Sequence, residues 1–164
     1  MNYRLLLGLL TAVVLSACGG DVPDDPTVST DPAPAAAAPP AGNTLPSIPI
    51  ERLEYLYTNA TYMDATFYKM PVSINQSELP QIQSTLTGIG AEPMPLLAAC
   101  EALGHIWFQV NGKNVEEADI YFQPECVGYV WYENGRPAYS NKLTESGLQF
   151  YSNIMQSVQQ NTGQ

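Results

Sequence analysis

Positive charge is scarce in this chain of 164 residues. It has 6 lysines and arginines against 16 aspartates and glutamates, which gives a formal net charge of −10. Binding to nucleic acid needs a basic surface, and electrostatic adhesion to anionic lipids needs clustered lysines or arginines. The composition therefore argues against nucleic acid as a partner and against a membrane surface held by charge.

Residues that carry specialised chemistry are also few. His105 is the only histidine, the 3 cysteines contain no Cys-x-x-Cys pair, and no Gly-x-Ser-x-Gly motif occurs. With neither a clustered ligand set nor a nucleophile motif, the sequence predicts no metal site, no cofactor and no catalytic residue. A small enzyme built on His105 stays open as an alternative, because a lone histidine can serve as a general base.

No apolar run reaches the roughly twenty residues that a membrane-spanning helix needs. The apolar segment at residues 5–15 follows the positively charged Arg4 and leads to small residues before Cys18. A charged start, an apolar core of about ten residues and small residues at a cleavage site predict a secretory signal peptide over residues 1–17.

The stretch Leu15-Ser16-Ala17-Cys18 resembles the lipobox of bacterial lipoproteins. This resemblance covers residues 1–20 and implies that Cys18 is lipidated and becomes the mature N-terminus. Gly19 follows the cysteine, whereas lipoproteins of the enterobacterial type that stay in the inner membrane often carry aspartate there. The resemblance thus implies a lipid anchor in the outer membrane, with the membrane as a partner through Cys18 alone. The domain is expected in the periplasm, and a surface-exposed orientation stays open.

Residues 18–46 are rich in proline and alanine and have scarcely a large apolar side chain. Such a segment cannot offset its conformational entropy by burial, so the sequence predicts a disordered tether. A single globular domain is expected over residues 47–160, followed by a disordered tail at 161–164. Cys100 and Cys126 remain as an even pair in an exported protein, and they are expected to form a disulfide.

Apolar residues at steps of three and four predict three helices before the strands, at residues 47–70, 77–88 and 95–103. Ser47 is the expected N-cap of the first helix, in which a break near residues 58–61 stays open because threonines weaken helix propensity. A closing helix is expected after Thr144, which can cap it. Cys100 would lie on the third helix.

Strands are predicted at residues 105–110, 118–122, 127–133 and 136–140. Asn111-Gly112 and Asn134-Gly135 are typical two-residue hairpin turns, and Pro137 predicts that the last strand lies at a sheet edge. The predicted fold class is therefore α+β: N-terminal helices, an antiparallel four-strand meander and a C-terminal helix, with one disulfide.

Carboxylates are densest at Glu116, Glu117 and Asp119. Their spacing does not match a calcium-binding loop, so a solvated loop before a strand is expected. Within a strand, Glu116 and Glu117 would point to opposite sides and could not act together.

Aromatic residues crowd the predicted strands and offer the clearest functional signal. Alternation places Tyr129 and Trp131 on one face of their strand, and these rings either fill the core or form an exposed platform. Because tyrosine and tryptophan with few nearby charges are typical of binding surfaces, the sequence predicts partner-binding residues on the outward face of the sheet. These residues are Trp107, Tyr129, Trp131 and Tyr139.

Together these features predict a non-catalytic accessory lipoprotein of the cell envelope that binds a protein or a glycan. One alternative is an inhibitor of an exported hydrolase such as a muramidase, since an acidic domain complements a basic enzyme. The other alternative is the small envelope enzyme that uses His105.

Overall fold

An antiparallel sheet of six strands, in the order β3-β2-β5-β6-β7-β8, organises the domain. The computed structural model describes residues 43–162 and the side chains of residues 44–160. The expected signal peptide, Cys18 and residues 19–42 of the expected tether lie outside the described residues. The sheet has more strands than the four-strand meander that the sequence predicts, because two strands precede it in the chain.

The strands of the large sheet are β2 (Tyr62–Phe67), β3 (Ser73–Gln76), β5 (Gly104–Val110), β6 (Lys113–Gln123), β7 (Cys126–Glu133) and β8 (Arg136–Lys142). A second, two-stranded sheet pairs β1 (Asn43–Thr44) with β4 (Pro95–Leu96). The helices are α1 (Ile50–Asn59), α2 (Leu79–Leu86) and α3 (Glu145–Thr162).

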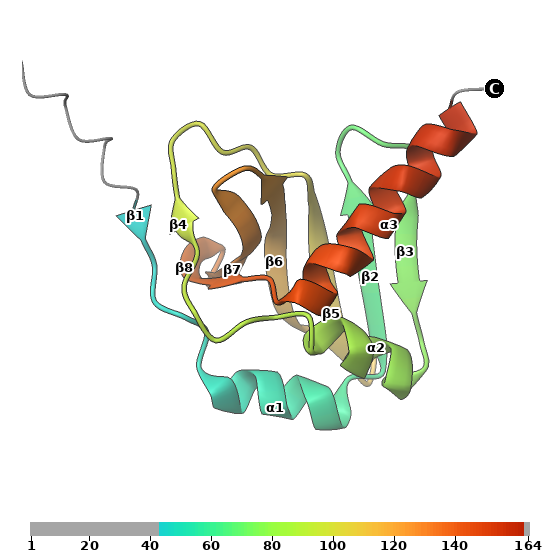
Figure 1. Ribbon diagram of the computed structural model, residues 1–164. Coiled ribbons are helices and arrows are strands. Elements are labelled where there is room, and N and C mark those ends of the chain that lie inside the picture. The colour runs from blue at the N-terminus through green and yellow to red at the C-terminus, as the bar shows by residue number, and fades with distance from the viewer. Residues whose placement is uncertain (1–42, 163–164) are drawn as a thin grey trace, which may run out of the picture. The chain divides into compact units, whose positions relative to one another are not determined.

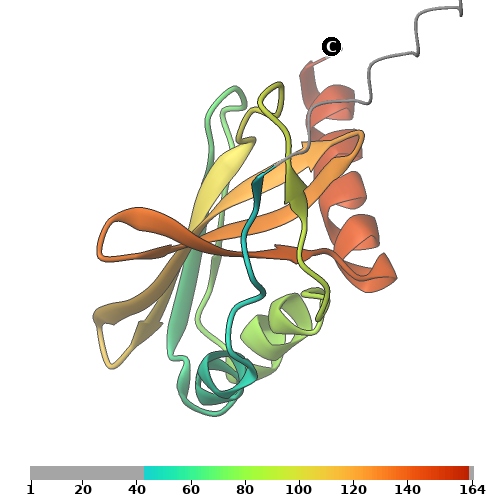
Figure 2. The ribbon, with the colours of Figure 1, turned by 90° about the vertical axis from the view of Figure 1, so that its left-hand side faces the viewer.

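The helices gather on one face of the large sheet. Figure 1 shows α1 and α2 near one end of the strands and α3 running obliquely across them. In Figure 2, turned by 90°, α3 lies to one side of the strands, and β1 and β4 run side by side. Leu56, Ile82 and Tyr151, one from each helix, are buried in the same apolar cluster as Phe108 and Trp131 of the sheet. Burying a large apolar side chain contributes about 1.5–3 kcal/mol, so this cluster holds the helices on the sheet.

The first predicted helix is wrong beyond Asn59, where α1 ends. Residues 62–67 form β2, in which Met63, Ala65 and Phe67 are buried and the residues between them are partly exposed. The apolar steps of three and four continue past Asn59 by coincidence, and β2 is stabilised by pairing with β3 and β5. The expected N-cap is also wrong, because the Ser47 hydroxyl donates to the Ala91 carbonyl and Pro49 occupies the cap position.

The third predicted helix, at residues 95–103, does not form. Pro95 and Leu96 instead form β4, which pairs with Thr44 and Asn43. We call residues 90–103 the covering segment, because its apolar side chains pack with Tyr121 and Val130 on the side of the sheet away from the helices. Residues 43–46 therefore belong to the domain rather than to the tether.

The hairpins, the edge strand and the disulfide are confirmed. Asn111 and Asn134 have φ angles of 50° and 53°, and the following glycines have 76° and 73°, as two-residue turns of this kind require. β8 contains Pro137 and lies at one edge of the sheet. The Cys100–Cys126 disulfide, with Cα atoms 6.2 Å apart, joins the covering segment to the start of β7.

Two of the predicted helices are also confirmed. α2 lies within residues 77–88, and α3 follows Thr144, whose hydroxyl accepts a hydrogen bond from the Gly147 amide at 3.3 Å. α3 continues through Thr162, two residues into the segment that the sequence predicts as a tail.

Candidate functional site

The side of the sheet away from the helices is only partly covered. Over β6 and β7, Tyr121 and Val130 lie beneath the covering segment. On β2 and β5, by contrast, partly exposed side chains alternate with buried ones. The buried ones face the helices, and none of the described helices covers the partly exposed ones. We call this second region, with its neighbours on β6 and β7, the open face. Its side chains are Tyr62, Asp64, Thr66, Tyr68, His105, Trp107, Gln109, Glu117, Asp119 and Tyr132.

Asp119 is the hub of the polar contacts on the open face. Its Oδ1 lies 2.7 Å from Nδ1 of His105, and the Tyr132 hydroxyl donates to its Oδ2 at 2.7 Å. The Tyr68 hydroxyl also donates to Oδ1, at 3.2 Å. Burial alone would raise the pKa of Asp119, but the hydrogen bonds from His105 and Tyr132 outweigh it and lower the pKa. Asp119 is therefore an ionised acceptor that orients three rings.

The same contacts act on the tyrosines. Burial, together with the hydrogen bond to the Asp119 carboxylate, raises the pKa of Tyr132. Burial and the charge of Asp119 likewise raise the pKa of Tyr68. Both phenols thus stay protonated and keep donating to Asp119 at neutral pH.

His105 is held between aromatic rings. Its ring centroid lies 4.4 Å from that of Trp107 and 5.8 Å from that of Tyr132. The other ring nitrogen, Nε2, is buried and has no hydrogen-bond partner among the described residues. The nearest charged atom to Nε2 is Oε2 of Glu117, 3.6 Å away. A histidine oriented by aspartate resembles a general base, yet a substrate could reach Nε2 only if the surrounding rings moved.

Two of the four predicted partner-binding residues are buried in the core. Tyr129 is 1% exposed and Trp131 is 0% exposed, both on the helix-covered face. Their rings do lie side by side, with centroids 5.5 Å apart, and the Tyr129 and Tyr151 hydroxyls are 2.6 Å apart. The prediction that they face outward is wrong, because alternation shows which residues share a face and not which face is covered.

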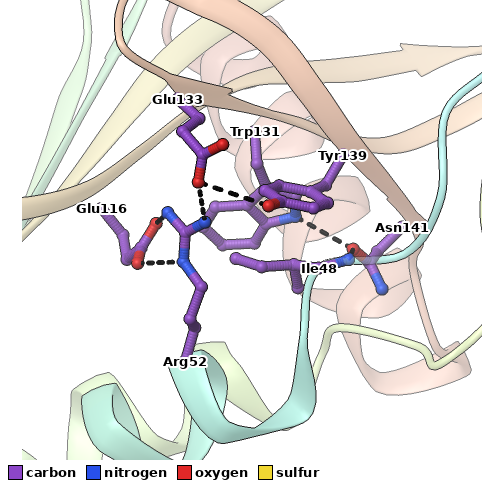
Figure 3. Close-up of polar contacts among 7 residues, drawn as sticks. All are labelled: Ile48, Arg52, Glu116, Trp131, Glu133, Tyr139 and Asn141. Atoms are coloured by element: carbon purple, nitrogen blue, oxygen red, sulfur yellow. Dashed lines mark hydrogen bonds and ion pairs between the residues drawn. The ribbon is translucent and has the colours of Figure 1, made fainter.

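Tyr139 pairs directly with Trp131 and also lies on the helix side, where Figure 3 shows its hydroxyl directed toward Glu133, which also binds Arg52. The distance from the Arg52 Cζ to the ring centroid is 5.1 Å. Arg52 donates from Nε and NH2 to the two oxygens of Glu116, both at 2.6 Å, and from NH1 to Glu133 at 3.0 Å. The hydrogen bond with Glu116 raises the pKa of Arg52. These contacts of Arg52 hold α1 against β6 and β7 and so stabilise the fold.

Trp131 is fixed by Asn141. The indole Nε1 donates to Oδ1 of Asn141 at 3.1 Å, and the backbone amide of Ile48 donates to the same oxygen at 3.1 Å (Figure 3). The buried tryptophan therefore has its polar atom satisfied, as expected for a core residue.

The acidic residues lie in β6 and not in a solvated loop, so that prediction is wrong. The prediction that Glu116 and Glu117 point to opposite sides is confirmed, since Glu116 binds Arg52 on the helix side and Glu117 lies near His105 on the open face. Trp107 is thus the one predicted partner-binding residue on the open face. Sequence reasoning missed Asp64, Tyr68 and Tyr132. The alternation of β5 places only His105 and Trp107 on one face, and Asp64 lies in β2, which the sequence predicts as part of a helix.

Comparisons of this chain with protein-family models, with curated proteins and with solved structures find no match. Within residues 43–162, no helix is long and apolar enough to cross a membrane. The same residues contain no group of three or more histidine, cysteine or acidic side chains placed to hold a metal ion.

Proposed function

We propose that this chain is a lipoprotein of the outer membrane whose domain is a non-catalytic module that binds a protein partner in the cell envelope. The observation that carries the proposal is Trp107, a partly exposed tryptophan at the centre of a sheet face that no helix within residues 43–162 covers. The resemblance of residues 15–18 to a lipobox supports the anchor, and the Cys100–Cys126 disulfide is consistent with an envelope location.

The chemistry of the open face supports binding. Tryptophan and tyrosine bring large apolar area with few rotatable bonds, and they are enriched among residues that dominate binding energy. The rings of His105 and Tyr132 are already oriented by Asp119. Little conformational entropy is lost when such a surface docks, which favours affinity.

The buried Nε2 of His105 favours binding over catalysis. An acid–base catalyst has to reach its substrate, whereas a binding face only has to present rings and polar atoms. The Asp119–His105 contact is then explained as a support that holds the neighbouring rings in place.

The test has two arms in the organism's own envelope. Replacing Cys18 with serine should release the protein from outer-membrane fractions, and persistence after a salt wash would contradict the anchor. In the second arm, Trp107→Ala should reduce cross-linking of the anchored protein to its partner at least tenfold. Tyr57→Ala is the matched control, because Tyr57 is 44% exposed on α1, on the other side of the sheet. Equal loss in both variants would contradict a role for the open face.

Inhibition of a basic exported hydrolase such as a muramidase is the second candidate. The observation that favours it is the charge of the open face, where Asp64, Glu117 and Asp119 are acidic and no lysine or arginine stands. A muramidase assay in the presence of the purified domain tests this candidate. Unchanged hydrolysis at saturating domain concentration would reject it and leave the binding module in place.

A further inference from the structure

We infer that the open face takes a cationic side chain, lysine or arginine, of a basic protein partner over the indole of Trp107 and between the carboxylates of Asp64 and Glu117. This inference rests on the proposed function and names the chemistry of the partner.

The three residues form one row across three strands. Asp64 of β2 is directly opposite Trp107 of β5, and Trp107 is directly opposite Glu117 of β6. Residues that are directly opposite in an antiparallel sheet share a face, with Cβ atoms about 4.5–5.5 Å apart. The indole is therefore flanked by a carboxylate on each side. An aromatic face attracts cations and flanking carboxylates add to this attraction, so the row suits an ammonium or guanidinium group.

Neither flanking carboxylate pairs with a lysine or arginine of the described residues. Within residues 43–162, Asp64 has no ion pair, and Glu117 has only His105 Nε2 at 3.6 Å. Other carboxylates do form ion pairs with a lysine or arginine: Glu116 pairs with Arg52, and Glu101 pairs with Lys69. The negative charge of the row is thus available to a partner.

Charge complementarity selects the occupant. A second copy would present the same acidic row, and the segment after Cys18 is itself acidic, with aspartates at positions 21, 24, 25 and 31. Nucleic acids and anionic lipid surfaces are repelled for the same reason. A basic protein surface is attracted, and its lysine or arginine is long enough to lie along the indole. A neutral glycan stacked on Trp107 is the competing outcome of the test.

The experiment uses the intrinsic fluorescence of the domain. The chain has 2 tryptophans, and because Trp131 is fully buried, a soluble ligand acts directly on Trp107. The probes are an oligolysine peptide, an uncharged oligoserine peptide and a chito-oligosaccharide. Oligolysine is expected to change the Trp107 emission in a saturable way, with an affinity that falls several-fold as salt rises, while oligoserine has no effect.

Charge-neutral variants locate the site. Asp64→Asn and Glu117→Gln should each raise the dissociation constant for oligolysine about threefold, and the double variant should raise it about tenfold. Glu54→Gln is the matched control, since it removes one charge from an exposed position on α1, and it should leave the constant within about twofold. Thermal melts of each variant check that the fold is intact, and Asp64→Glu should retain binding.

The failures are distinguishable. If the chito-oligosaccharide saturates the Trp107 signal and oligolysine does not, or if the row variants bind oligolysine like Glu54→Gln, the inference is overturned. In that case the proposed function still stands if Trp107→Ala reduces cross-linking of the anchored protein. If Trp107→Ala leaves cross-linking unchanged, the proposed function fails as well.

Discussion

Trp107 and Trp131 lie on opposite faces of the same sheet. Trp107 is directly opposite Glu117, and the next residue of β6, Ala118, is directly opposite Trp131. Since neighbouring residues of a strand point to opposite sides, one indole faces the open side and the other faces the helices. The same residue type therefore has two different roles here, one at the surface and one in the core.

Trp131→Ala should destabilise the domain strongly. The side chain is 0% exposed, and its loss leaves a cavity and removes the donor to Asn141, so we expect a decrease of about 3–5 kcal/mol in the free energy of unfolding. Urea denaturation followed by circular dichroism measures it. A loss below about 1 kcal/mol would contradict the placement of Trp131 in the core.

Trp107→Ala should leave stability nearly unchanged, because the indole is partly exposed and its loss opens no cavity beneath the helices. We expect a melting temperature within about 4 °C of the wild type, measured in the same buffer as Trp131→Ala. A drop as large as that of Trp131→Ala would show that Trp107 supports the fold.

The α+β fold class could be predicted from the sequence, but the strands β2, β3 and β4 could not. The hairpins at Asn111-Gly112 and Asn134-Gly135 carry a local turn signal, so β5 to β8 are found correctly. β2 has no such signal. Its residues fit a helical period as well as an alternating one, and only pairing with β5 decides between them. β4 is likewise set by distant partners, since it pairs with β1 and packs on β6 and β7.

The candidate site was harder to predict because of a bulge. The turn at Asn111-Gly112 pairs Val110 with Lys113, and counting back from it would place His105 opposite Ala118. The register shifts by one residue near Val115, so His105 meets Asp119 instead. A one-residue shift in register moves a side chain to the other face of the sheet, and no residue near Val115 predicts this shift.

Arg52→Met should destabilise the domain by about 2–3 kcal/mol, because it leaves the carboxylate of Glu116 buried without its bidentate partner. The double variant with Glu116→Gln should recover part of this loss, since the unpaired buried charge is removed. Chemical denaturation of the three proteins tests the coupling. Strictly additive losses would contradict a paired role for Arg52 and Glu116.

Replacing Cys100 and Cys126 together with serine should lower the free energy of unfolding by about 3–4 kcal/mol, as the chain-entropy account gives for a loop of this size. The covering segment should then loosen from β6 and β7, which exposes Met94 and Val130. Hydrogen exchange of residues 90–103 and of the α1 amides separates local from global effects. Faster exchange in α1 alone would contradict the role of the disulfide in holding the covering segment.

Asp119→Asn should change how stability depends on pH. The pKa of Asp119 is lowered in the folded protein, so its ionised form favours folding; this stabilisation is present above the unfolded-state pKa of about 4 and is lost as the pH falls through the lower folded value. We expect the variant to be less stable than the wild type by about 2 kcal/mol at pH 7, and the gap to close towards pH 3.

Urea denaturation at both pH values measures this gap, with Glu54→Gln on α1 as a control of the same charge change. The control should differ from the wild type by less than about 0.5 kcal/mol at either pH, because Glu54 is exposed. A gap for Asp119→Asn that stays constant with pH would mean that the asparagine fails for steric reasons. A gap that closes identifies the ionised carboxylate as the group that orients His105, Tyr68 and Tyr132.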